Sequence, residues 1–292
     1  MSIETSLPGA RRRPGRLLGT LILAAAALSP SKVSAQAACS LVPVDGGEIY
    51  ACEYGAGPST VVLAAGAGQH SGSWSGIVER LAESHRVVTF DRPGLGRSPS
   101  IDGPRTPTRI AGELAEVLDH LGIEDRVLVV GHSMGGLHAV RFAAMHPDRV
   151  GRVVMVDTPP PGFEQARMSL LSPEEQAERR RLLEEGAARA APIVRREREG
   201  AEPAEEWAAP NFSRDTPLTV IVADAQNFGT QGSLEAHRRL WQDGQEEWLA
   251  LSDDAERIVA EGRGHMVHVE DPELVLRAIL GSSPGGSDVS VR

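Results

Sequence analysis

Short apolar runs rich in β-branched residues alternate along this 292-residue chain with amphipathic helical patterns. A parallel strand needs a long crossover, usually a helix, before the next strand can pair with it. The alternation therefore predicts an α/β fold with a mostly parallel sheet and crossover helices. The expected strands are 59–64, 86–90, 127–130, 153–156, 218–223 and 258–260, and the expected helices are 74–82, 108–121, 137–144 and 272–280.

Residues 158–216 form a connection too long to lack structure in a compact domain. Within it, Ser172 is followed by a proline at the first helical position and by Glu175 three residues on, which predicts a helix start. We expect 158–216 to be a small helical cap on a core made of 36–157 and 217–281. Its apolar residues available to face the core are Met168, Leu170, Leu171, Trp207 and Phe212.

The first 35 residues have the order of a secretory signal peptide. A cluster of arginines precedes the uncharged stretch 17–28, and small residues lead to Val33-Ser34-Ala35, a cleavage-type sequence. At helical rise, 17–28 covers only about 18 Å, against about 30 Å for a bilayer core. We expect 1–35 to be removed and the protein to be exported, to periplasm or medium, with no membrane segment left. The Gly/Ser-rich tail 282–292 is expected to be flexible.

Export favours a disulfide between Cys39 and Cys52, the two cysteines of the chain. Asp45-Gly46 between two strand-like runs is a strong signal for a two-residue hairpin turn. Such a turn places Cys39 opposite Cys52 at a non-hydrogen-bonded position, where facing residues approach most closely. The sequence predicts a structural Cys39–Cys52 bridge. The alternatives are two free thiols, or another register through Gly46-Gly47.

Gly131-His132-Ser133-Met134-Gly135 lies between an expected strand and an expected helix. G-x-S-x-G in this setting predicts a nucleophile elbow, a sharp turn that exposes the serine hydroxyl above the sheet edge. Ser133 is therefore the candidate nucleophile. Because a serine hydroxyl is a weak nucleophile, it needs a base to take its proton.

With this elbow, the chain resembles the α/β-hydrolase superfamily over nearly all of 36–281. Further motifs are Gly66-Ala67-Gly68 after an early strand, a loop 91–98 that reads D-x-x-G-x-G-x-S, and Gly264-His265 before the closing helix. The resemblance implies a mostly parallel central sheet with helices on both faces and a small helical cap. It also implies a serine hydrolase of the esterase type with a Ser-His-acid triad.

The resemblance makes His265 the general base, whereas the acid is open. The family usually supplies the acid shortly after the strand 218–223, where Gln226 holds the usual position and Asp224 lies two residues early. Some members take it from the end of the strand after the nucleophile helix, where this chain has Asp157. We favour Asp157 because of its place at a strand end, and Asp224 is the alternative.

The oxyanion hole implied by the resemblance consists of two backbone N–H groups, those of Met134 and Ala67. The family often has a histidine before the first glycine of the Gly66–Gly68 loop. This chain has Ala65 there, so the loop must be anchored differently.

The formal net charge of −10 argues against a nucleic-acid partner. The sequence lacks zinc-ligand spacings and glycine-rich nucleotide loops, so neither a metal nor a cofactor is expected. Ser133 stands where a dehalogenase of this fold has aspartate.

We expect an exported serine hydrolase that cleaves ester-like bonds of a small or medium acyl substrate through an acyl-enzyme, with that small molecule as its partner. Alternatives on the same fold are a perhydrolase, a lactonase, a C–C hydrolase, or a non-catalytic member that binds a ligand or protein.

Overall fold

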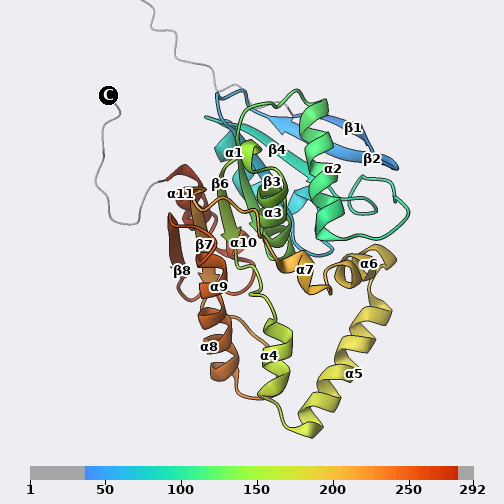
Figure 1. The fold of residues 1–292 in the computed structure, drawn as a ribbon, viewed down its shortest axis with the longest axis vertical. Helices are drawn as coiled ribbons and strands as arrows, with labels where there is room; N and C mark the ends of the chain where they lie inside the picture. The colour runs from blue at the N-terminus through green and yellow to red at the C-terminus, as the bar shows by residue number, and fades with distance from the viewer. Residues whose placement is uncertain (1–36, 282–292) are drawn as a thin grey trace, which may run out of the picture. The chain divides into compact units, whose positions relative to one another are not determined.

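The computed structural model describes residues 37–281, so the expected signal peptide and tail lie outside the described residues. An eight-stranded sheet in the order β1-β2-β4-β3-β5-β6-β7-β8 forms the centre (Figure 1). The antiparallel pairs are β1–β2 and β2–β4, and the pairs from β4 across to β8 are parallel. The strands are β1 (Ala38–Val44), β2 (Gly47–Tyr54), β3 (Thr60–Ala64), β4 (Arg86–Asp91), β5 (Val127–His132), β6 (Val150–Val156), β7 (Leu218–Ala223) and β8 (Ala255–Ala260).

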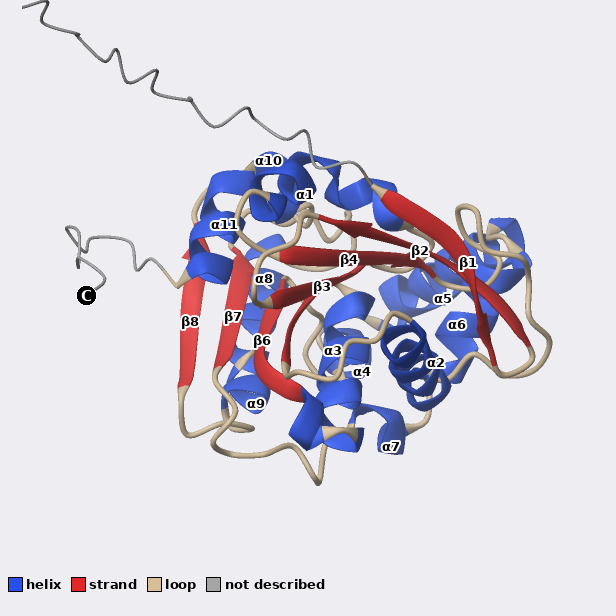
Figure 2. Ribbon diagram, turned by 90° about the horizontal axis from the view of Figure 1, so that it is seen from above, coloured by secondary structure: helices blue, strands red, loops and turns tan. Residues whose placement is uncertain are grey.

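Helices cover both faces of the sheet (Figure 2). On one face, α2 (Pro107–His120) and α3 (Met134–Met145) pack in one apolar cluster, and on the other, α1 (Ser75–Ala82) and α11 (Pro272–Leu280) pack in a second. In β3, Val62 and Ala64 belong to the first cluster, whereas Val61 and Leu63 belong to the second. This alternation follows from the two-residue period of a strand. The mostly parallel α/β fold predicted from the sequence is confirmed.

Several element boundaries differ from expectation. Helix α3 begins at Met134, directly after the elbow. Strand β8 begins earlier than expected, at Ala255. Its first residues include charged side chains at an exposed sheet edge, so they do not show the apolar run by which a strand is recognised. Three helices lie outside the elements expected from the sequence: α8 (Leu234–Gly244), α9 (Glu246–Leu249) and the short α10 (Val267–Glu270). Within 37–281, no helix combines the length and apolar character needed to cross a membrane.

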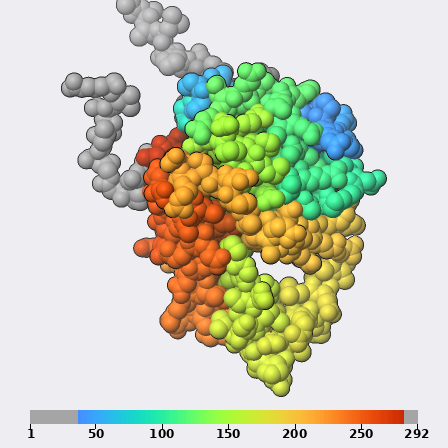
Figure 3. Space-filling model, viewed as in Figure 1, coloured from blue at the N-terminus to red at the C-terminus, as the bar shows by residue number. Residues whose placement is uncertain are grey.

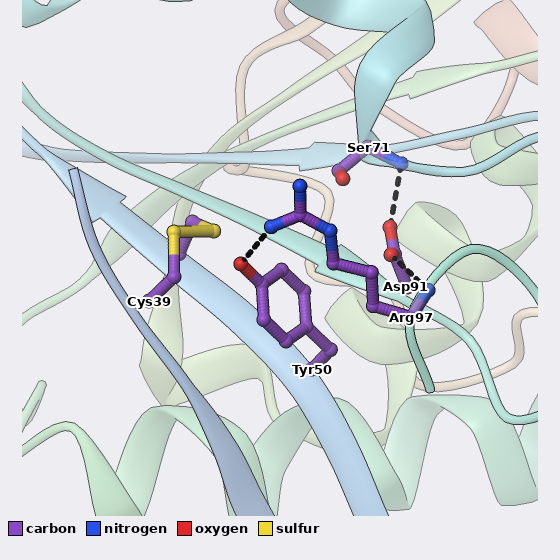
Figure 4. Close-up of a disulfide and its surroundings, with 6 residues drawn as sticks. Cys39, Tyr50, Ser71, Asp91 and Arg97 are labelled. Atoms are coloured by element: carbon purple, nitrogen blue, oxygen red, sulfur yellow. Dashed lines mark hydrogen bonds between the residues drawn. A yellow bond between two sulfur atoms is a disulfide. The ribbon is translucent and has the colours of Figure 1, made fainter. Parts of the chain in front are cut away.

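The β1–β2 hairpin turns at Asp45-Gly46, where Gly46 has a φ of 82°. This left-handed conformation favours glycine. The register places Cys39 opposite Cys52, and a disulfide joins the two side chains (Figure 4). Beside it, the Asp91 carboxylate accepts the backbone N–H groups of Ser71 and Arg97, each at 2.8 Å. Asp91 thus holds the glycine-rich loop that follows β4.

The connection between β6 and β7 contains α4 (Phe163–Ser169), α5 (Pro173–Arg189), α6 (Pro192–Gly200) and α7 (Ala204–Trp207). The capping box at the start of α5 is formed: the Ser172 side chain accepts the Glu175 N–H, and the Glu175 carboxylate accepts the Ser172 N–H. The space-filling view shows an opening bordered by the yellow-green, yellow and gold segments of this region (Figure 3).

The apolar residues of this region divide between core and solvent. Leu171 and Phe212 are buried, and Met168 and Trp207 are half-buried. The expectation for Leu170 is wrong, because its side chain is 50% exposed. Leu170 lies just past the end of α4, where the chain turns, so that only the next side chain, Leu171, reaches the interior.

Candidate active site

Ser133 lies on the sharp turn between β5 and α3, with φ 52° and ψ −125°. A non-glycine residue with positive φ is held there by its surroundings, and such strain is concentrated at functional sites. A Cβ on Gly131 would overlap the backbone of Gly135, one on Gly135 would overlap the Ala64 carbonyl, and one on Gly136 would overlap the Thr158 hydroxyl. The three glycines therefore let the turn pack against its neighbours.

The structure brings Ser133, His265 and Asp157 together at the carboxyl ends of the parallel strands. His265, between β8 and α10, has Nε2 3.0 Å from Ser133 Oγ. Its Nδ1 lies 2.6 Å from Oδ2 of Asp157, which follows β6 directly. Asp224 lies elsewhere, with its carboxylate accepting the Gly262 N–H at 2.6 Å. The geometry thus joins His265 to Asp157.

The Asp157 carboxylate is fully buried and accepts four donors. Oδ1 accepts the N–H of Ala223 and the indole N–H of Trp241, both at 2.9 Å. Oδ2 accepts the Gln226 side-chain amide and faces His265 Nδ1. Three donors besides His265 thus hold the carboxylate in place beside the ring.

Besides His265, Asp157 has two side-chain partners that the sequence did not indicate, Gln226 and Trp241. Gln226 stands at the family's usual acid position, but nothing in the local sequence indicates that its amide donates to a carboxylate at the end of the neighbouring strand. Trp241 lies on α8, a helix that was not predicted. The visible signal was the amide at position 226, which retains a hydrogen-bonding group where the acid usually stands.

Two buried histidines pack under His265. His132 Nε2 lies 2.9 Å from the His265 carbonyl oxygen, and the rings of His132 and His268 have centroids 4.2 Å apart. Burial holds the pKa of His132 well below its usual value, and the neighbouring His268 and His265 lower it further. Burial also lowers the pKa of His268 to about 4. Both rings are therefore neutral at pH 7 and act as packing under the His265 loop.

The loop and the helix that carry the two predicted oxyanion donors border Ser133. Gly66 lies against the serine, since a Cβ built on Gly66 would stand 3.3 Å from that of Ser133. The Gly66 N–H is used by the Gln69 side chain at 3.1 Å, which makes Ala67 N–H the next donor along the loop. Met134 is the first residue of α3, and the first N–H groups of a helix have no acceptor within it.

An aromatic cluster flanks His265. The Trp241 ring meets His265 edge-on with centroids 6.2 Å apart, and Phe163 of α4 meets Trp241 edge-on at 4.8 Å. Phe228, on the loop after β7, lies 5.3 Å from Phe163. Phe163 of α4 is thus packed, largely buried, in an aromatic cluster near the site. Within 37–281, no group of three or more histidine, cysteine, aspartate or glutamate side chains could hold a metal ion.

Residues 61–278 match the model of the alpha/beta hydrolase family, and the chain belongs to that family. A hydrolase named for 2-hydroxy-6-oxononadienedioate and 2-hydroxy-6-oxononatrienedioate, from Paraburkholderia phymatum, is 44% identical over 108 residues, which are 35% of this chain and 37% of that protein. An esterase from Mycobacterium tuberculosis is 38% identical over 124 residues, or 41% of this chain and 40% of that protein.

The chain spans about two fifths of the length of the first curated relatives it matches. Among solved structures, a thermophilic esterase from Thermogutta terrifontis is similar with a TM-score of 0.59 and 22% identity. The likeness covers 85% of this chain and 97% of that one. At that identity the likeness establishes the shared fold.

Proposed function

We propose that this protein is a serine hydrolase that cleaves ester-like bonds of small or medium acyl substrates through an acyl-enzyme. The observation that carries the proposal is the continuous hydrogen-bonded series from Ser133 Oγ through the His265 ring to Asp157. A serine on a strained elbow with a base at 3.0 Å is the arrangement that activates a hydroxyl.

In the proposed reaction, Ser133 Oγ attacks the substrate carbonyl while His265 Nε2 takes its proton. Asp157 holds Nδ1–H and stabilises the imidazolium that forms. The N–H groups of Met134 and Ala67 donate to the oxygen that becomes negative. His265 then protonates the leaving alcohol, and a water molecule activated by the same ring hydrolyses the acyl-enzyme to acid and free Ser133.

Two further features support parts of the proposal. The aromatic cluster of Phe163, Phe228 and Trp241 beside His265 favours an apolar acyl or alcohol group. The Cys39–Cys52 disulfide favours a protein that acts after export, because disulfides persist in oxidising compartments.

A second candidate is hydrolysis of a carbon–carbon bond in an unsaturated hydroxy-oxo dicarboxylate. The specific support is the similarity to the oxononadienedioate hydrolase of Paraburkholderia phymatum. Both reactions use an activated serine or water beside the same histidine, so the substrate panel must separate them.

The test is a fluorophosphonate probe on the folded protein, with mass spectrometry to locate the adduct. We expect labelling at Ser133 that is lost in Ser133→Ala and His265→Ala. Turnover of p-nitrophenyl esters of graded acyl length is then expected, with a vinylogous diketo acid as the C–C comparison. A folded protein that neither labels nor hydrolyses any ester would refute the proposal and favour a binding role.

A further inference from the structure

Arg92 is a buried arginine that the reaction outlined above does not use. It follows β4 directly and is 2% exposed. Its guanidinium makes a two-pronged contact with Glu197 of α6, from Nε to Oε1 at 2.7 Å and from Nη2 to Oε2 at 3.0 Å. The Glu197 side chain is fully buried. An ion pair this deep joins the β4 loop to a helix of the cap.

The other side of the guanidinium binds the loop that carries Ala67. Nη1 donates to the Ala65 carbonyl at 2.6 Å, and Nη2 donates to the Gly66 carbonyl at 2.8 Å, where it joins the Gln69 N–H at 3.1 Å as the charged one of two donors. The Gly66 carbonyl and the Ala67 N–H belong to one trans peptide and point in opposite directions. Fixing that carbonyl therefore fixes the direction of the Ala67 N–H. A charged donor on the carbonyl also polarises the amide and strengthens its N–H as a donor.

We propose that Arg92 and Glu197 are positioning residues. They orient the Ala67 N–H toward the reacting oxygen and make this orientation depend on the packing of α6 against the core. The inference rests on the proposed hydrolase function. It also accounts for Ala65, because the guanidinium supplies the loop anchor that the family's histidine would provide. If α6 moved away, Arg92 would be a buried charge without a partner, so the cap and the loop are held together.

Contacts of α6 about one turn before Glu197 strengthen this link. A Cβ on Gly68 would lie 3.2 Å from Val194, and one on Gly94 would lie 3.2 Å from Ile193. Ile193 and Val194 are both in α6, which therefore packs on the oxyanion loop and on the loop after β4.

The chain offers a matched control. Arg105 and Glu113 form a second buried pair, with side chains 0% and 3% exposed. Their two-pronged contact joins the loop before α2 to α2 itself. Unlike the Arg92–Glu197 pair, this pair does not link the cap to the loop of residues 65–67. A purely structural role predicts the same consequence for losing either pair.

The experiment compares Arg92→Met/Glu197→Met with Arg105→Met/Glu113→Met. Removing both partners together leaves no fully buried charge unpaired, which keeps the variants foldable. In the control, Arg109 also contacts Glu113, but its side chain is 25% exposed and can reach water. The readouts are kcat and KM on a p-nitrophenyl ester, and the inhibition constant of a trifluoromethyl ketone, which forms a tetrahedral anion on serine. Thermal unfolding is measured for every variant.

For Arg92→Met/Glu197→Met we expect kcat to fall about 10- to 100-fold, below the 10²- to 10³-fold of a deleted oxyanion donor because the N–H remains but is misaimed. The ketone should lose affinity by a similar factor, with KM changed by less than about threefold. The control pair should keep kcat within about threefold. Arg92→Lys, which keeps the charge but not the fork, should show the same kcat loss.

An unchanged kcat in Arg92→Met/Glu197→Met, or an equal loss in the control pair, would overturn the inference. If that double variant does not fold, the kcat of Arg92→Lys decides in its place, and an unchanged kcat in Arg92→Lys would overturn the inference. A wild-type protein that neither labels at Ser133 nor turns over ester would refute the proposed function as well. Labelled wild type with an unaffected Arg92 variant refutes the inference alone.

Discussion

Replacing Asp157 by asparagine separates activity from stability. The four donors around the carboxylate differ in how they can respond. The Ala223 N–H and the Trp241 indole N–H are always donors, whereas Gln226 can turn its amide and His265 can move its ring proton. The asparagine oxygen is therefore expected to face Ala223 and Trp241, with its NH₂ toward Gln226 and His265.

In that arrangement the His265 ring accepts at Nδ1 and carries its proton on Nε2. Nε2–H then points at Ser133 Oγ, 3.0 Å away, and cannot take the serine proton. The corresponding loss in a Ser-His-Asp triad is about 10⁴-fold in kcat, or about 5 kcal/mol of transition-state stabilisation. Because the N–H groups of Ala223 and Trp241 keep their acceptor and the new amide finds acceptors on Gln226 and His265, the free energy of unfolding should change by less than about 1–2 kcal/mol.

The assay is ester hydrolysis under saturating substrate, together with denaturant unfolding followed by tryptophan fluorescence, to which Trp241 contributes. Asp224→Asn is the matched control, because its side-chain oxygen can still accept the Gly262 N–H, and we expect its kcat to stay within about twofold of wild type. An Asp157→Asn enzyme that keeps more than about a tenth of wild-type kcat, or an Asp224→Asn enzyme that loses activity, would refute the reasoning.

Three further predictions concern stability. Unfolded protein should contain no titratable thiol, and reducing the Cys39–Cys52 bridge, with its sequence separation of 13, should lower the unfolding free energy by about 2–3 kcal/mol; two reactive thiols before reduction would contradict this. Gly135→Ala should destabilise by about 1–3 kcal/mol, because its Cβ meets the Ala64 backbone, whereas Gly186→Ala in α5, with open space around it, should stabilise by about 0.5–1 kcal/mol; equal effects would refute the packing argument. Because the folded-state pKa of His268 is lowered to about 4, the unfolded chain binds its proton first, and stability should fall as pH drops from about 6.5 to 4, by about 3 kcal/mol from this residue. Unfolding curves of wild type and His268→Phe across that range test this, and parallel pH profiles would contradict it.

Local sequence patterns were sufficient to predict much of the fold. The two-residue period of the strands, the turn at Asp45-Gly46 and the capping box at Ser172 each depend on residues close together in sequence. The strand Leu218–Ala223 and the helix Pro272–Leu280 were predicted to the residue. The motif around Ser133 located the elbow, because a tight strand-to-helix turn restricts which residues can flank it.

Two kinds of feature could not be predicted from local sequence: the exposure of single side chains, and a helix whose apolar periodicity is weak. Leu170 was expected to face the core but lies where the chain turns out of α4, a direction set by the neighbouring helices. The helix Leu234–Gly244 carries many polar residues, with only His237 and Trp241 buried, so its apolar face was too narrow to recognise.

The sequence by itself determined the α/β architecture, the hairpin register and the serine elbow, because periodicity, turn chemistry and steric limits act over a few residues. Only the tertiary structure decided which carboxylate meets His265 and what surrounds it. Gln226 and Asp157 are 69 positions apart, and Arg92 and Glu197 are 105 apart. Such pairs are chosen by the packing of distant elements against one another, and no local pattern records that choice.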